Sequence, residues 1–169
     1  KDVKKKKTPF GTKEWAEKNE NLISGCSNDC KYCYAKSMAI QYKRKTPDNW
    51  KLEVIRDPYL LKKKIKKQNY TIMYPSAHDI TPEHLWENMI YLHNIIQSGN
   101  KLLIVSKPHL DCVKGICDYF KEYKDKILFR FTIGSSDSDV LKFWEPNAPD
   151  FKERLESLNM HSTMDSRQA

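Results

Sequence analysis

The chain has 169 residues, 39% of them hydrophobic and 31% charged, which suits one domain with a hydrophobic core. Its formal net charge of +8 fits a polyanionic partner such as nucleic acid, although a lysine-rich composition that serves solubility alone gives the same charge. No run of about 18 apolar residues is present, so we expect no membrane span. The sequence begins at Lys1, and we expect it to be a processed or partial chain.

Apolar periodicity and turn residues divide the chain into alternating strands and helices. Residues 1–20 form a charged lead-in with a short helical turn near Trp15, residues 21–160 form the folded domain, and residues 161–169 form a polar tail. The expected strands cover residues 21–24, 70–74, 101–106 and 127–133. The expected helices cover residues 32–44, a stretch that starts at Pro58, residues 82–98 and 110–123, and two stretches that start near residues 136 and 150.

The clearest local signals lie in the middle of the chain. Residues 101–106 form a continuous apolar run, which is typical of a strand buried on both faces of a parallel sheet. Thr81 and Pro82 suit the N-cap and first turn of the helix before that strand, and Gly99 stops this helix. Strand and helix alternate four times, which predicts an α/β fold with a parallel sheet. The pattern alone does not distinguish a doubly wound sheet from a partial barrel.

Three cysteines lie within eight residues, at Cys26, Cys30 and Cys33, in the spacing C-x3-C-x2-C. Iron-sulfur clusters are bound by cysteine thiolates, and three local ligands leave one iron of a 4Fe-4S cluster open. A closed zinc site needs four ligands, so the zinc alternative requires a distant one, such as His78 or one of the other two cysteines. Five cysteines with three of them clustered favour a reducing cytoplasm over a disulfide framework.

The three cysteines, with the aromatic Tyr32 directly before the third, resemble the signature of the radical S-adenosylmethionine (radical SAM) enzymes. The resemblance implies that Cys26, Cys30 and Cys33 bind three irons of a 4Fe-4S cluster, and that the fourth iron chelates S-adenosylmethionine. Reductive cleavage then yields methionine and a 5′-deoxyadenosyl radical that abstracts hydrogen from a substrate. The resemblance also implies a reductant protein of the flavodoxin or ferredoxin type. In such enzymes the protein binds and orients the cofactors that carry the chemistry.

Within this superfamily the chain looks most like the branch that includes spore photoproduct lyase. The similarity is carried by residues 25–35, 104–107, 145–149 and 154–155, and it spans residues 21–158. It implies a partial (β/α) barrel of the radical SAM type, with about four βα units of a (β/α)6 core visible. In such folds the site lies at the carboxyl ends of the strands.

The same resemblance implies which side chains bind the cofactor. Lys107 contacts the carboxylate of S-adenosylmethionine as a point-charge donor. Ser76 and Thr132 supply hydroxyl groups from the loop after the second strand and from the fourth strand. Tyr32 lines the adenine.

Two residues are expected to take part in catalysis. Tyr34, which follows Cys33, can join a hydrogen-transfer chain, and His78 can act as a proton relay because imidazole titrates near neutral pH. The neighbouring Asp79 joins this relay, contacts the substrate as His78 also could, or caps the helix that follows. Arg130 either lies buried against an anion or points outward as a solvated cation.

The chain departs from the family pattern in three places. It lacks the glycine-rich motif that many members use for the amino group of S-adenosylmethionine, and residues 75–79 stand in its place. It has Ser76 and Ala77 where the lyase has a cysteine hydrogen donor, so repair of thymine dimers is not implied. The C-terminal strands that complete substrate contacts in the family are not in the sequence.

We therefore expect a cytoplasmic iron-sulfur enzyme that cleaves S-adenosylmethionine reductively and abstracts hydrogen from an unknown substrate, with nucleic acid as one candidate. The alternative is a non-enzymatic zinc-binding module whose lysines contact nucleic-acid phosphates. A third hypothesis is an inactive remnant that retains the cysteine loop.

Overall fold

Residues 11–166 are described by the structure, which is a computed structural model. No helix within them is both long and apolar enough to cross a membrane. Short 3₁₀-helices lie at Gly11–Glu14, Pro58–Leu61, Pro82–His84 and Lys121–Lys126. The strands and α-helices are β1 (Lys18–Asn19), β2 (Ile23–Ser24), α1 (Tyr34–Gln41), β3 (Val54–Ile55), β4 (Thr71–Tyr74), α2 (Leu85–Gln97), β5 (Lys101–Ser106), α3 (Leu110–Tyr119), β6 (Ile127–Phe131), α4 (Ser138–Trp144) and α5 (Phe151–Ser166).

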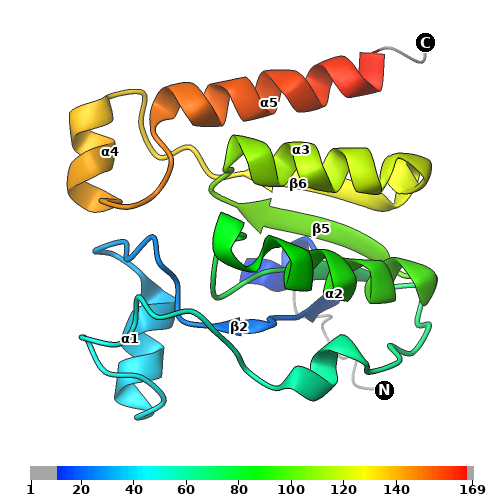
Figure 1. Ribbon diagram of the computed structural model, residues 1–169, viewed down its shortest axis with the longest axis horizontal. Coiled ribbons are helices and arrows are strands. Elements are labelled where there is room, and N and C mark those ends of the chain that lie inside the picture. Colours follow the sequence, from blue (N-terminus) through cyan, green and yellow to red (C-terminus); the bar gives the residue numbers. More distant parts are fainter. Residues whose placement is uncertain (1–10, 167–169) are drawn as a thin grey trace, which may run out of the picture.

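Four strands form a parallel sheet in the order β1, β4, β5, β6 (Figure 1). The order follows the chain, so each strand of the sheet lies beside the one before it. Tyr74 of β4 pairs with Ile104 of β5, and Ile104 pairs with Phe129 of β6, which defines the register. β2 and β3 form a separate antiparallel ribbon. The predicted mixed α/β fold with a parallel sheet is confirmed.

Helices α2 and α3 cover one face of this sheet, and α5 packs along α3 (Figure 1). Alternate residues of a strand point to opposite faces. Met73, Leu103 and Val105 therefore point away from α2 and α3, and they pack instead with Ala16. The main core between the sheet and the two helices contains Ile72, Tyr74, Leu92, Ile95, Ile96, Leu102, Ile104, Ile116 and Phe120.

The second face of the sheet is only partly covered. The register places Leu128 and Arg130 of β6 beside Leu103 and Val105. Leu128 is 63% exposed, so this face of β6 is open to solvent. Arg130 is exposed, and its guanidinium carbon lies 3.9 Å from the centroid of the Trp15 ring. Of the two predicted roles for Arg130, burial against an anion is therefore wrong.

The strand that begins the parallel sheet differs from the predicted one. β1 lies within residues 1–20, which we expected to be a lead-in outside the sheet. The strand predicted at residues 21–24 instead forms β2, which pairs antiparallel to β3. Because β1 is a two-residue edge strand, it needs no apolar pattern, and charged residues suit an exposed edge.

The helix predicted from Pro58 is only a single 3₁₀-helix that ends at Leu61. Residues 62–67 then continue without helical structure, and five of these six residues are lysines. Like charges at helical spacing repel one another, and the buried Asn100 offers the backbone an alternative. Asn100 donates to the carbonyl oxygen of Lys66 at 3.1 Å, and its Oδ1 accepts from the amide of Gln68 at 3.0 Å.

The C-terminal helix is longer than predicted. Helix α5 continues to Ser166 and so includes part of the tail predicted for residues 161–169, because extending a formed helix costs little. The rest of that tail, residues 167–169, and residues 1–10 of the lead-in lie outside the described residues.

Leu92 and Leu128 form a matched pair that tests this one-sided sheet, since Leu92 is fully buried and Leu128 is exposed. We expect Leu92→Ala to lower the free energy of unfolding by about 2–5 kcal/mol, because it removes buried methyl groups and leaves a cavity. Leu128→Ala should change it by less than about 0.5 kcal/mol. Urea denaturation measures both, and equal losses would contradict an open face on β6.

Candidate metal and cofactor site

The cysteine loop, residues 25–33, leaves β2 through a turn that requires glycine. Gly25 has a φ of +96°, and a Cβ at this position would lie 2.4 Å from the carbonyl oxygen of Leu52 and 2.7 Å from that of Trp50. Glycine avoids both the strain and the clash. The amide of Cys26 then donates to the carbonyl oxygen of Trp50 at 3.1 Å, so the loop lies directly against the segment before β3.

The loop runs straight into helix α1. Cys33 is the N-cap of this helix, and its Sγ accepts from the amide of Lys36 at 3.4 Å. The ammonium group of Lys36 pairs with Asp29 at 2.7 Å. The last cysteine of the motif is therefore held by the first turn of the helix, and the loop is tied back to that turn.

Burial raises the pKa of Cys26 to about 12 and that of Cys30 to about 11. The negative charge of Asp79 adds to the shift at Cys26, whereas the Lys107 ammonium opposes the shift at Cys30. The two thiols therefore retain their protons at neutral pH. Because thiolate is the form that binds metal, loading a metal centre here releases these protons.

The three sulfur atoms are not gathered for a single metal ion. Among the described residues, these cysteines do not form a group whose ligand atoms all lie within 4.8 Å of one another. Zinc–sulfur bonds of about 2.3 Å in a tetrahedral site place the sulfurs about 3.8 Å apart.

A cavity of about 570 Å³ opens beside the cysteine loop, at the carboxyl ends of β4, β5 and β6. This volume lies in the range of small-molecule sites. Trp15, Met73 and Arg130 line it from the open face of the sheet. The cavity also brings together all nine residues predicted for the site, namely Cys26, Cys30, Tyr32, Cys33, Tyr34, Ser76, His78, Lys107 and Thr132.

Asp79 holds a central place that the sequence did not predict, since its expected roles were a relay, a substrate contact or a helix cap. Its carboxylate accepts from the side chain of Asn28 at 2.9 Å and from the amide of Lys107 at 2.8 Å. The hydroxyl of Ser106 donates to it at 3.2 Å, and the Lys107 ammonium lies 3.4 Å away. Asp79 lies in the loop after β4, beside the predicted cofactor-binding residue Lys107, and this position could have identified it from the sequence.

Asp79 and Lys107 form a partly buried ion pair that is charged at neutral pH. Burial acts to raise the pKa of Asp79, but the Lys107 ammonium and the hydrogen bonds outweigh it and lower the pKa. Burial likewise acts to lower the pKa of Lys107, but the Asp79 carboxylate, together with smaller contributions from Cys30, Tyr32 and Glu145, outweighs it and raises the pKa. The Lys107 ammonium is thus a fixed cation, 5.9 Å from the centroid of the Tyr32 ring.

His78 is held in its neutral form by backbone contacts. Its Nε2 accepts from the amide of Ile23 at 3.3 Å, and its Nδ1 lies 2.9 Å from the carbonyl oxygen of Asp79, to which it must donate. Burial lowers the pKa of His78 to about 4. The imidazole therefore ties β2 to the loop after β4, and its predicted role as a relay stays a prediction.

The two tyrosines of the motif are anchored to different segments. The hydroxyl of Tyr32 donates to Glu145, and that of Tyr34 donates to the carbonyl oxygen of Ser76. Glu145 also pairs at 2.5 Å with Arg154, which is fully buried. Residues 145 and 154 both belong to the segments that carry the resemblance, and their pairing attaches the start of α5 to the mouth of the cavity.

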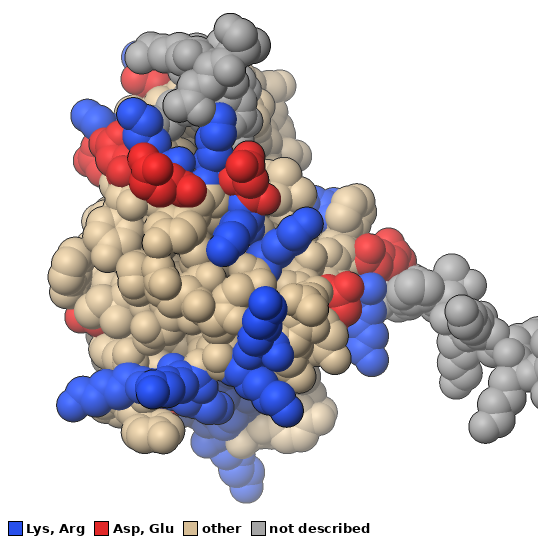
Figure 2. All heavy atoms as spheres, turned by 90° about the vertical axis from the view of Figure 1, so that its right-hand side faces the viewer, with Lys and Arg blue, Asp and Glu red and all other residues tan. Residues whose placement is uncertain are grey.

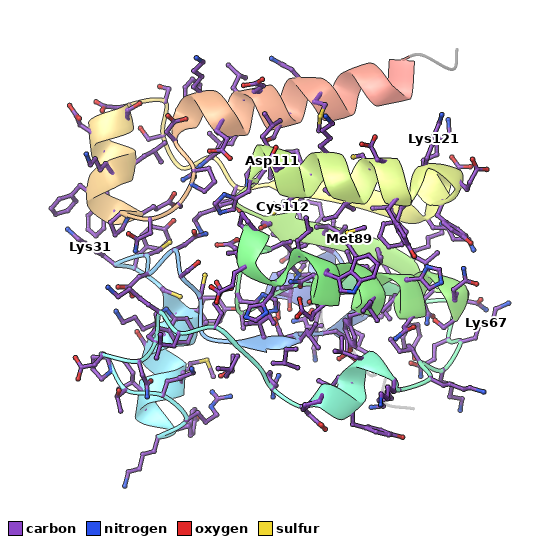
Figure 3. All side chains as sticks on the ribbon, in the orientation of Figure 1. Lys31, Lys67, Met89, Asp111, Cys112 and Lys121 are labelled. Carbon is purple, nitrogen blue, oxygen red and sulfur yellow. The ribbon has the colours of Figure 1, made fainter. Side chains whose placement is uncertain are left out.

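The remaining cysteines do not contribute to this site. Cys112 is buried in the core between α3 and the sheet (Figure 3), and neither it nor Cys117 of α3 lines the cavity. Both ring nitrogens of His78 already contact backbone groups. The three residues considered as a fourth zinc ligand are therefore separate from the cysteine loop or already engaged.

Comparison with known proteins assigns no family. No protein-family model and no solved structure matches the chain. The chain is similar to an uncharacterized protein, ORF301, of Acidianus two-tailed virus, with 29% identity over 153 residues that cover 82% of this chain and 49% of the viral protein. The chain thus spans about half the length of this relative.

His78 predicts a specific pH dependence of stability in the metal-free protein. Its folded pKa of about 4 lies below the unfolded value near 6.5, so the unfolded state binds a proton first as the pH falls. The stabilisation is complete above about pH 6.5 and is lost towards pH 4, by roughly 3 kcal/mol in total. The free energies of unfolding of wild type and His78→Gln should therefore converge over this window, and parallel profiles would contradict the buried neutral imidazole.

Proposed function

We propose that the chain is an iron-sulfur enzyme of the radical SAM type, similar to the spore photoproduct lyase branch. The observation that carries the proposal is the convergence of the nine predicted residues on one cavity. These residues come from four separate segments, spread from position 26 to position 132. A cavity at the carboxyl edge of a parallel sheet is where such folds bind ligands.

The arrangement of the sheet supports a partial barrel. A doubly wound sheet reverses its strand order and carries helices on both faces. Here the described strands of the parallel sheet follow one another in chain order, α2 and α3 lie on one face, and the cavity lies on the other. These features are the ones expected for about four βα units of a (β/α)6 barrel, with the cavity on the inner side.

The residues around the cysteine loop fit an iron-sulfur cluster. Three thiols open into the cavity, and their sulfurs are more widely spaced than a single zinc ion requires. Two buried polar atoms nearby, Asn28 Oδ1 and Trp50 Nε1, have no hydrogen-bond partner among the described residues. Buried polar atoms are nearly always paired, so these two favour a bound group at this place.

Cys26, Cys30 and Cys33 would hold the cluster, and the cavity beside them would hold S-adenosylmethionine. When bound, the cluster supplies the electron that cleaves the sulfonium to methionine and a 5′-deoxyadenosyl radical. The chain's own residues bind and orient these groups.

Four residues of the cavity would hold S-adenosylmethionine in this proposal. Lys107, kept charged by Asp79, offers an ammonium donor to the carboxylate of S-adenosylmethionine. Ser76 and Thr132 offer hydroxyl groups from the loops after β4 and β6. Tyr32, anchored on Glu145, presents its ring to the adenine.

Nucleic acid remains our proposal for a partner, on the basis of charge. Lys67 of the lysine-rich segment at residues 62–67 lies at the opposite end of the molecule from Lys31 of the cysteine loop (Figure 3). The view onto the side of the molecule that carries Lys67 shows basic side chains gathered over its lower half (Figure 2). This segment can contact phosphates but lies away from the cavity.

The first prediction from this proposal concerns the cluster. Anaerobically reconstituted protein should be brown, show a reduced 4Fe-4S electron paramagnetic resonance signal that changes when S-adenosylmethionine is added, and form 5′-deoxyadenosine. Cys30→Ala should abolish deoxyadenosine formation because a cluster ligand is lost, whereas Cys117→Ala, outside the cavity, should retain it. Formation that persists in Cys30→Ala, or a colourless protein that contains zinc, would overturn the proposal in favour of the zinc module.

The second prediction concerns nucleic acid. If residues 62–67 contact phosphates, the affinity for DNA or RNA should fall steeply between about 50 and 200 mM salt, because bound counterions are released. Fluorescence anisotropy with a labelled oligonucleotide measures this change. Replacing Lys62, Lys63 and Lys64 by Gln should weaken binding, and replacing Lys43, Lys51 and Lys142 by Gln is the charge-matched control. An affinity that does not depend on salt would contradict this role.

A further inference from the structure

A second set of metal-ligand side chains lies outside the cavity. One carboxylate oxygen of Glu53, one of Glu83 and one ring nitrogen of His84 all lie within 4.8 Å of one another. Glu53 precedes β3, whereas Glu83 and His84 belong to the 3₁₀-helix that leads into α2. The fold therefore brings together an imidazole and two carboxylates from segments about thirty residues apart.

The tautomer of His84 leaves a lone pair without a partner. Its Nε2 lies 3.3 Å from the backbone carbonyl oxygen of Glu53, which can only accept, so Nε2 carries the proton. Nδ1 is then the acceptor nitrogen, and it is fully buried without a hydrogen-bond partner among the described residues. Histidines that bind metals have this arrangement, in which one nitrogen donates to a carbonyl and the other binds the ion.

Glu53 is oriented as a metal ligand would be. Its side chain is buried, with the residue only 7% exposed. Oε1 accepts from the amide of Ser27 at 2.8 Å, and Oε2 accepts from the hydroxyl of Thr81 at 2.5 Å. A carboxylate oxygen has two lone pairs, so each oxygen keeps one for an ion, and the two hydrogen bonds supply the outer-shell support typical of metal sites.

We propose that Glu53, Glu83 and His84 bind a divalent metal ion through two carboxylates and one imidazole. This donor set suits Mn²⁺, Fe²⁺ or Zn²⁺, and its oxygen ligands distinguish it from the cysteine site, which favours softer metals. Glu87, whose Oε2 lies 3.8 Å from Nδ1 of His84, is available as a further ligand. The competing explanation is that His84 is protonated and simply forms an ion pair with Glu87.

The ion would connect this site to the cysteine loop. Glu53 already holds the amide of Ser27, which follows Cys26 directly. An ion bound between Glu53 and the start of α2 would fix the carboxylate that supports the loop. The site is separate from the nine cavity residues, so the inference does not depend on the proposed activity.

Mn²⁺ is the probe for this site, because it prefers oxygen and imidazole donors over thiols. The full chain is titrated with MnCl₂, and free Mn²⁺ is followed by electron paramagnetic resonance. We expect one saturable site whose affinity falls at least ~10-fold in Glu83→Gln/His84→Gln. The control Glu122→Gln/His93→Gln makes the same chemical changes elsewhere on the chain and should bind as wild type does.

Further variants keep the test decisive. Glu83 is exposed, so Glu83→Gln alone should fold and should also weaken binding, which would support the site even if the double variant were unstable. Cys30→Ala should bind Mn²⁺ as wild type does, whatever the outcome for the cluster. No saturable binding by wild type, equal affinity in the two double variants, or loss of binding in Cys30→Ala would each overturn the proposal.

Discussion

A partly buried carboxylate in the loop after β4 holds the candidate site together. Asp79 receives hydrogen bonds from Asn28 of the cysteine loop and from Ser106 and Lys107 at the end of β5. Removing a charge from water costs free energy unless the charge is paired and hydrogen-bonded. The ion pair comes from Lys107 after β5, and the hydrogen bonds come from both the end of β5 and the cysteine loop. The loop, β4 and β5 must therefore adopt their observed positions together, which positions the thiols relative to the Lys107 ammonium.

The C-terminal part of the chain closes this arrangement from the other side. The amide of Lys31 donates to the carbonyl oxygen of Trp144 at 2.9 Å. The side-chain amide of Asn147 donates to the backbone carbonyl oxygen of Ser27 at 3.0 Å. Arg154 anchors the same segment through its buried pair with Glu145. Figure 1 shows the consequence, since α4 lies over the cysteine loop although the two are far apart in sequence. The loop is thus held between β4 and the connection from α4 to α5.

The one-sided sheet explains why a cavity can exist beside this loop. Helices α2 and α3 fill one face with apolar side chains, whereas the other face carries Met73 and Val105 at the floor of the cavity. The same face remains open at β6, where Leu128 is exposed. Helices packed over this second face would fill the space that the cavity now occupies.

The errors of the sequence analysis have a common physical origin. The apolar run at residues 101–106 predicted β5 correctly because burial on both faces selects a single class of residues. The stretch from Pro58 carried three apolar residues at helical spacing, yet the fold ended the helix after Leu61, and Asn100 binds the backbone that follows. β1 was missed because its two residues take their conformation from pairing with β4 rather than from their own side chains. The local pattern of apolar residues predicts secondary structure well where burial determines which residues are used. It predicts poorly where the backbone conformation depends on a partner far away in the sequence.

From the sequence alone it followed that three thiols share one loop, and most of the strand and helix order could be predicted. Three thiols within eight residues must share one loop whatever the rest of the chain does, and the apolar periods of α2 and β5 follow from burial. Three contacts became known only from the packing of the chain. They are the contacts of Asp79 with Asn28, of Tyr32 with Glu145, which is 113 positions further along the chain, and of Glu53 with His84. Each of these contacts joins polar groups that the packing of the sheet and loops brings together. Polar side chains follow no periodic pattern from which a distant partner could be predicted.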